Sequence, residues 1–195
     1  PPVIDSVVVS DETCYGFSDG IIGVFASSSN GSLVYSIDSL ITSQTDSIFN
    51  GLADSSYWVG IEDTAGCKIH QSTVVGGHAP LLVDSTTSSN FYCDYDTSGT
   101  IEIFVQGGVQ PYTYSVDGGN TFSNVSLINN LDSGNYSIVV RDSLGCETTP
   151  QGVYIKYFEP PQIDTVVTTD ILCTNNAVGE ISISTVMGYA PYQYS

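Results

Sequence analysis

The residues with the clearest chemistry are five cysteines whose spacing repeats along the chain. Cys14 is followed by Cys67, and Cys93 by Cys146, with the same gap of 53 positions. Equal gaps favour one disulfide per copy, Cys14–Cys67 and Cys93–Cys146, with Cys173 unpaired because its partner would lie beyond the end of this stretch. A rival pairing, Cys67–Cys93 with Cys146–Cys173, would link neighbouring copies. Disulfides imply an oxidising compartment and therefore export.

Metal binding and catalysis have weaker support. No Cys-x-x-Cys or Cys/His cluster occurs, so no zinc site is predicted. We expect no cofactor, with calcium as the alternative, bound by Asp5, Asp84 and Asp164 near the joints between copies. No catalytic residue is predicted, because the serines lie in no nucleophile-elbow context. The sequence therefore favours a protein that is not an enzyme.

The cysteines belong to a longer unit with a period of about 79–80 residues. Residues 52–67 (LADSSYWVGIEDTAGC) recur as residues 131–146 (LDSGNYSIVVRDSLGC). A glycine also follows the first cysteine of each copy by six positions, at Gly20, Gly99 and Gly179. This periodicity predicts two full copies and the start of a third: 1–79, 80–159 and 160–195.

Apolar residues within each copy alternate with a period of two, as in strands that bury one face. No sustained helical period occurs, and Asn-Gly, Gly-Gly and Asp-Gly steps separate the strands. The prediction is an all-β protein of tandem immunoglobulin-like β-sandwiches. Tyr57 and Tyr136 lie where such folds place a tyrosine corner, and Ser115–Phe122 follows the Asp-box pattern of a hairpin.

The charge of the chain excludes some partners. Its formal net charge is −18, with 21 acidic residues against three basic ones. Such a chain has no cationic surface to replace the counterions of nucleic acid or to bind an anionic membrane. No apolar run approaches the length of a membrane span. We expect neither nucleic acid nor a membrane span among its interactions.

The order of motifs in each copy resembles the SprB-type repeat of Bacteroidota surface adhesins. The residues that carry the resemblance are Cys93, Gly99, Pro111-Tyr112-Thr113-Tyr114-Ser115, Leu131, Gly134-Asn135-Tyr136 and Asp142-Ser143-Leu144-Gly145-Cys146. The first copy departs from it, with Ser32 for the proline and Ser55 for the glycine. The resemblance implies a secreted, filament-like adhesin at the cell surface, exported by the type 9 system and used in gliding or attachment.

Seven Asp-Ser or Asp-Thr pairs precede an apolar residue or threonine, which resembles the O-glycan acceptor sequence of Bacteroidota. The candidate acceptors are Ser6, Ser39, Ser47, Thr64, Ser85, Ser143 and Thr165. Asp-Ser and Asp-Thr are also good turn formers, which is the alternative explanation.

The expected function is therefore structural, with neighbouring repeats of the same chain as the main partners. Surface polysaccharide and other filament copies are further expected partners. One alternative is a carbohydrate-binding module in which Tyr15, Trp58, Phe91 or Tyr95 stacks on a sugar. Another is an accessory region of a secreted glycan-degrading enzyme.

Overall fold

The computed structural model describes residues 1–92, 98–170 and 178–194, and this part of the chain contains strands and no helix. It forms two compact units. Unit 1 comprises Pro1–Asp84, Val105–Thr113 and Val140–Thr148, and unit 2 comprises Ser85–Phe104, Tyr114–Val139 and Thr149–Ser195. The expectation of an all-β protein is confirmed.

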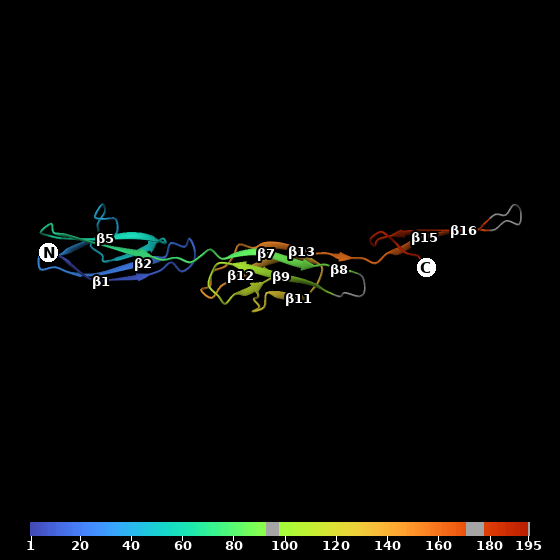
Figure 1. The fold of residues 1–195 in the computed structure, drawn as a ribbon, viewed down its shortest axis with the longest axis horizontal. Coiled ribbons are helices and arrows are strands. Elements are labelled where there is room, and N and C mark those ends of the chain that lie inside the picture. The colour runs from blue at the N-terminus through green and yellow to red at the C-terminus, as the bar shows by residue number, and fades with distance from the viewer. Residues whose placement is uncertain (93–97, 171–177, 195) are drawn as a thin grey trace. The chain divides into compact units, whose positions relative to one another are not determined.

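The first copy is a sandwich of two three-stranded sheets (Figure 1). One sheet has the order β1-β2-β4, and the other has the order β3-β5-β6. Their bounds are β1 Val3–Ser10, β2 Gly20–Ser27, β3 Leu33–Ser36, β4 Ile48–Leu52, β5 Ser55–Asp63 and β6 Lys68–Val75. Alternate apolar residues of both sheets meet in one buried cluster: Ile22, Val24, Leu52, Val59, Ile61 and Val75. This burial supplies the main favourable free energy of folding.

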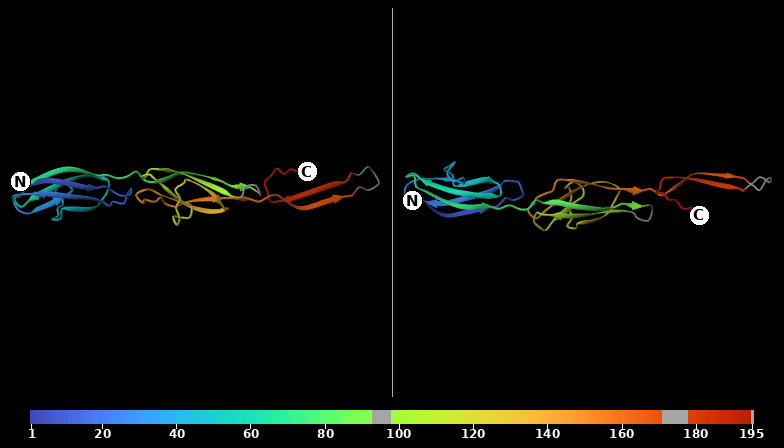
Figure 2. Two further views of the ribbon diagram at one scale, coloured as in Figure 1. Left: turned by 90° about the horizontal axis from the view of Figure 1, so that it is seen from below. Right: turned by 45° about the horizontal axis from the view of Figure 1, so that its top comes forward.

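The second copy repeats the arrangement with the orders β11-β9-β7 and β10-β12-β13. Its strands are β7 Leu82–Ser89, β9 Gly99–Gln106, β10 Thr113–Ser115, β11 Leu127–Leu131, β12 Gly134–Arg141 and β13 Gln151–Ile155. A short parallel pair joins β8 (Phe91–Tyr92) to β14 (Tyr157–Phe158). The third copy begins with an antiparallel hairpin of β15 (Gln162–Thr169) and β16 (Glu180–Val186), drawn in red in Figure 2.

In the two full copies, the glycine six positions after the first cysteine opens a central strand and lies against the opposite sheet. A Cβ on Gly20 would lie 2.5 Å from Val75 Cγ1 and 2.7 Å from the Leu52 carbonyl oxygen. A Cβ on Gly99 would lie 2.6 Å from Ile155 Cγ2. Such distances leave no room for a side chain, so the repeated glycine is a packing requirement.

The two predicted corner tyrosines have the same geometry in both copies. The Tyr57 hydroxyl donates to the Ala53 carbonyl at 3.0 Å, and the Tyr136 hydroxyl donates to the Asp132 carbonyl at 2.9 Å. Each bond closes the turn that leads into β5 or β12. Both tyrosines therefore lie as a tyrosine corner requires, while the more specific immunoglobulin-like topology stays a prediction.

A carboxylate organises the loop after β3 and the equivalent loop after β10. Asp38 accepts hydrogen bonds from the Ser36 hydroxyl, the Thr42 hydroxyl and the N–H groups of Ile41 and Thr42. These bonds, led by the one from Ser36, lower the pKa of Asp38 to about 2. In the second copy, bonds from Thr121 and Ser115 lower the pKa of Asp117 in the same way. The Asp-box pattern of the second copy therefore marks a hydrogen-bonded loop that the first copy forms as well, without the two glycines.

Replacing Asp38 by asparagine is expected to destabilise the first copy in a pH-dependent way. The carboxyl has its ordinary pKa of 3.8 in the unfolded chain and about 2 in the folded one. Its contribution is therefore fully present above pH 3.8 and is lost as the pH falls through 3.8 towards 2. Thermal unfolding of Asp38→Asn at several pH values should show a deficit at pH 7 that narrows below pH 4. Asp46→Asn, which removes the charge from a side chain that accepts only one N–H, that of Ile48, should show a smaller deficit. Equal deficits in the two variants would contradict the conclusion that the Asp38 carboxylate organises the loop after β3.

The same loop differs between copies in backbone strain. Ser39 and Leu40 have φ angles of 62° and 66°, where the second copy has Gly118 and Gly119. A non-glycine residue with left-handed φ costs about 1 kcal/mol. Ser39→Gly should therefore raise the free energy of unfolding of the first copy by about 1 kcal/mol, measured by denaturant titration. The reciprocal Gly118→Ser should lower that of the second copy by a similar amount, and effects of the same sign would refute the strain argument.

Candidate functional site

Each Asp-x-x-Gly-Cys motif forms one turn at the end of a central strand. In the second copy, Asp142 Oδ1 accepts the N–H groups of Leu144 and Cys146, both at 2.9 Å. The Asp142 carboxyl is buried, and its Oδ2 accepts the N–H of Val109 at 3.0 Å. Gly145 has a φ of 88°, so a glycine is favoured at this position. The carboxylate thus fixes the position of Cys146 in the turn that follows β12.

The first copy builds the same turn around Asp63. Its Oδ1 accepts the N–H groups of Ala65 and Cys67, both at 3.0 Å, and its Oδ2 accepts hydrogen bonds from Ser28 and Asn30. Burial alone raises the pKa of Asp63, but the hydrogen bonds outweigh it and hold the pKa below its ordinary value. The Asp63 carboxylate is therefore charged at neutral pH and satisfied by its own turn.

Cys14 lies in a loop between β1 and β2 that is held by two carboxylates. Asp19 accepts the N–H of Thr13 at 2.9 Å and its hydroxyl at 2.5 Å, and these bonds lower the pKa of Asp19. Glu12 is buried and accepts the N–H of Ser18 at 2.5 Å. These hydrogen bonds hold the loop that contains Cys14 in a defined conformation.

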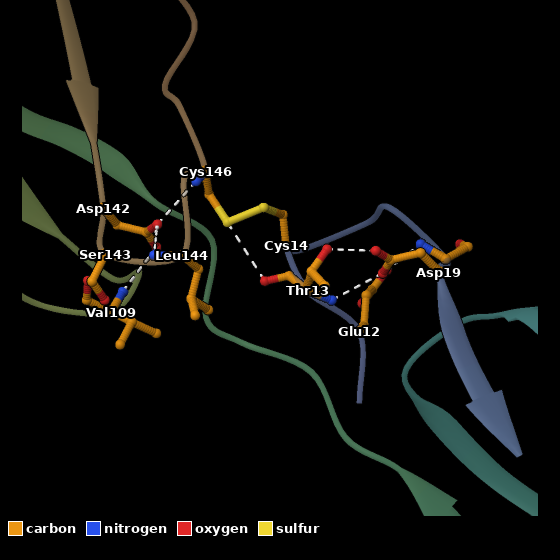
Figure 3. Close-up of a disulfide and its surroundings, with 10 residues drawn as sticks. Glu12, Thr13, Cys14, Asp19, Val109, Asp142, Ser143, Leu144 and Cys146 are labelled. Carbon is orange, nitrogen blue, oxygen red and sulfur yellow. Dashed lines mark hydrogen bonds between the residues drawn. A yellow bond between two sulfur atoms is a disulfide. The ribbon is translucent and has the colours of Figure 1, made fainter. Parts of the chain in front are cut away.

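Cys14 forms a disulfide with Cys146 within unit 1 (Figure 3). The Cα atoms are 5.7 Å apart, and the two residues are separated by 132 positions. The Cys146 sulfur also lies 3.5 Å from the carbonyl oxygen of Thr13. The bond therefore joins the first loop of one copy to the last turn of the next.

This disulfide corrects the predicted pairings. Cys14 is bonded to Cys146 and not to Cys67, which is a free thiol. The Glu12 N–H donates to Gly76, just beyond the end of β6, whereas Cys67 directly precedes β6. Eight residues of strand span about 26 Å, far beyond the roughly 7 Å that a disulfide allows between Cα atoms. Because Cys146 is bonded to Cys14, the predicted pair Cys93–Cys146 and the rival pair Cys146–Cys173 are also wrong. Cys93 and Cys173 themselves lie outside the described residues.

Contacts around the disulfide bring the linker between copies into the same site. Ser143 donates its N–H and its hydroxyl to the Val109 carbonyl, both at 3.0 Å. The neighbouring Gly108 donates its N–H to the Ala79 carbonyl at 3.0 Å. A Cβ on Gly107, which has a φ of 73°, would overlap the Pro80 carbonyl oxygen. Sulfur bridge, loop and linker together make this site a joint, which we call the disulfide joint.

Part of the second copy, including the Gly107-Gly108 loop of the disulfide joint, is similar to a known repeat family. Residues 85–121 match the SprB repeat. The match confirms the resemblance inferred from the motifs, and it includes Gly99, the Gly107-Gly108 loop and the Asp117 loop. The SprB repeat is a structural repeat of cell-surface proteins and not a catalytic family. No curated protein matches the chain.

Three of the four aromatic residues proposed to stack on a sugar lie in the described part of the chain. Phe91 is buried and packs against Tyr157, with ring centroids 5.2 Å apart. Tyr15 and Trp58 are exposed, the first in the Cys14 loop and the second on β5. Tyr95 lies outside the described residues. Of the four, Phe91 is thus excluded as an open sugar-binding surface.

The candidate glycan acceptors lie mostly at the surface. Six of the seven are exposed and Ser47 is half-buried. Three hydroxyls are engaged: Thr64 donates to Asn30, Ser143 donates to Val109, and Thr165 bonds Ser184. The remaining exposed acceptors, Ser6, Ser39 and Ser85, have no such partner among the bonds described. Structure therefore ranks these three first as acceptors.

The aspartates considered as calcium ligands occupy equivalent strands of the three copies. Asp5, Asp84 and Asp164 are exposed, on β1, β7 and β15. Within the described residues, no group of three or more His, Cys, Asp or Glu side chains is arranged to hold a metal ion. The described part of the chain also contains no helix able to cross a membrane.

Proposed function

We propose that the chain is a non-enzymatic segment of a cell-surface adhesin or filament, whose β-sandwich copies are structural units joined covalently in series. The observation that carries this proposal is the Cys14–Cys146 disulfide, because it connects successive copies. The SprB match supports a cell-surface repeat. The 21 acidic residues against three basic ones give the segment a strong net negative charge, which favours solubility and opposes self-association.

A disulfide joint has a direct mechanical consequence for such a segment. When the chain is pulled from its two ends, the load passes from Cys14 through the sulfur bridge to Cys146. The intervening residues therefore cannot extend while the bond is intact. A separation of 132 positions corresponds to about 450 Å of extended chain. The proposed role is thus a segment of limited extensibility at the cell surface.

Single-molecule pulling on residues 1–195, held at the two ends, tests this role. The oxidised protein should unfold to a length about 450 Å shorter than the protein with a reducing agent present. A Cys67→Ala variant should behave like the unmodified protein, since Cys67 is a free thiol. Equal lengths with and without the reducing agent would rule out the mechanical role.

Surface display is tested separately on the cells that make the protein. Antibodies raised against residues 1–195 should label intact cells, and external protease should remove the label. Labelling that requires permeabilised cells would contradict a cell-surface adhesin.

Glycosylation of the segment is a further part of this proposal. Glycans on Ser6, Ser39 and Ser85 would cover exposed strands and turns of both copies. The intact mass of protein taken from those cells should exceed that of the bare polypeptide, and site mapping should find sugar on these three residues more than on Thr64 or Ser143. An intact mass equal to the bare polypeptide would refute the modification.

A further inference from the structure

The Cys67 turn repeats the hydrogen bonds that link aspartate and cysteine in the Cys146 turn, yet its thiol is free. Asp63 N–H donates to the Cys67 carbonyl at 3.0 Å, and Asp142 N–H donates to the Cys146 carbonyl at 3.0 Å. Both carboxylates also accept the N–H of their own cysteine. The two cysteines therefore occupy equivalent positions in the two copies.

One hydrogen bond from each turn to a neighbouring loop is equivalent as well. The Thr64 hydroxyl donates to the Asn30 carbonyl, as the Ser143 hydroxyl donates to the Val109 carbonyl. Ser143 follows Thr64 by 79 positions, and Val109 follows Asn30 by the same 79 positions. Loop geometry alone would not identify a partner, but the equivalent Cys146 is itself bonded to the first-loop cysteine of the preceding copy. The second copy thus shows which group such a turn binds.

No cysteine in the described part of the chain fills this role for Cys67. Cys14 is bonded to Cys146, and it lies at the opposite end of β6. We propose that Cys67 forms a disulfide with the first-loop cysteine of another copy of this repeat, one that carries Cys at the position of Cys14 and Gly six residues later. The partner copy precedes this one in the same polypeptide or belongs to a second molecule. This inference rests on the proposed structural role and adds the covalent partner of Cys67.

The covalent step balances as a thiol–disulfide exchange. Cys67 loses its proton, and its thiolate attacks the partner cysteine, which is held in a mixed disulfide with a low-molecular-weight thiol. The Cys67–partner bond forms, the bond to the small thiol breaks, and the released thiolate takes up a proton. The low-molecular-weight disulfide that formed the mixed species is the oxidant.

Disulfide mapping of the natural protein tests the proposal. The protein is extracted at its full natural length from the cells that make it, with free thiols alkylated by N-ethylmaleimide, and is digested without reduction. Mass spectrometry should find the Cys67 peptide linked to a Cys-x-x-x-x-x-Gly peptide other than the one that contains Cys14. On a non-reducing gel, a monomer places the partner in the same polypeptide, and a dimer that reduction dissociates places it in a second molecule; both results support the proposal.

Three results in the same digest overturn it: Cys67 recovered as the alkylated thiol, linked to Cys14, or linked to another Asp-x-x-Gly-Cys peptide. The state of the Cys14–Cys146 bond separates this failure from that of the proposed function. If that bond is present while Cys67 is alkylated, only the proposed Cys67 disulfide is contradicted. If Cys14 and Cys146 are alkylated as well, the proposal that successive copies are joined covalently is contradicted too.

Discussion

Replacing Cys14 and Cys146 together by alanine is expected to lower the free energy of unfolding by about 5 kcal/mol. The bond closes a loop across 132 positions, and in the chain-entropy model its main effect is to restrict the unfolded chain. For a chain of this size, the loss corresponds to a fall in Tm of about 10 °C. Calorimetry of the oxidised protein and the double variant measures the difference.

Cys67→Ala is the matched control for that experiment. Cys67 lies in the same kind of turn, bonded to its aspartate in the same way, but is a free thiol. Its replacement should cost less than about 1 kcal/mol. A reducing agent should bring the unmodified protein to the Tm of the double variant and leave that variant unchanged. Similar losses for the double variant and Cys67→Ala would show that the disulfide adds nothing beyond the turn.

The period of the sequence could establish the copies but not how their cysteines pair. Cys14–Cys67 and Cys14–Cys146 both recur with the period, because the second gap equals the first plus one copy of 79 residues. Only the strand register separates them, since it places Cys14 and Cys67 at opposite ends of β6. Register comes from long-range pairing, which local sequence patterns do not encode.

Local chemistry was more predictable than pairing. Alternating apolar residues such as Ile22 and Val24 indicated a buried strand face, and both side chains are in the core. Tyr57 was placed correctly at its corner. The Asp38 loop could not be found in the first copy, because Ser39 and Leu40 stand where the second copy has its two glycines. Its carboxylate imposes the same conformation without the usual turn residues.

Replacing Gly20 by alanine is expected to be the most damaging change of a single atom in the first copy. The new Cβ would lie 2.5 Å from Val75 Cγ1 and 2.7 Å from the Leu52 carbonyl oxygen. Val75 is fully buried, and the second obstacle is backbone of the paired strand β4. Overpacking of this kind costs about 3 kcal/mol. Denaturant unfolding of the oxidised protein measures the loss for the first copy.

Gly23→Ala supplies the control within the same strand, because strand β2 contains both glycines. A Cβ on Gly23 would have its nearest contact at 3.9 Å, with the Val8 carbonyl oxygen. Alanine there also restricts the unfolded chain, so the substitution should be neutral or stabilise by up to about 1 kcal/mol. Equal losses for the two variants would mean that strand β2 resists any added side chain. A large loss for Gly20→Ala alone would establish that Gly20 is required by contact between the two sheets of the first copy.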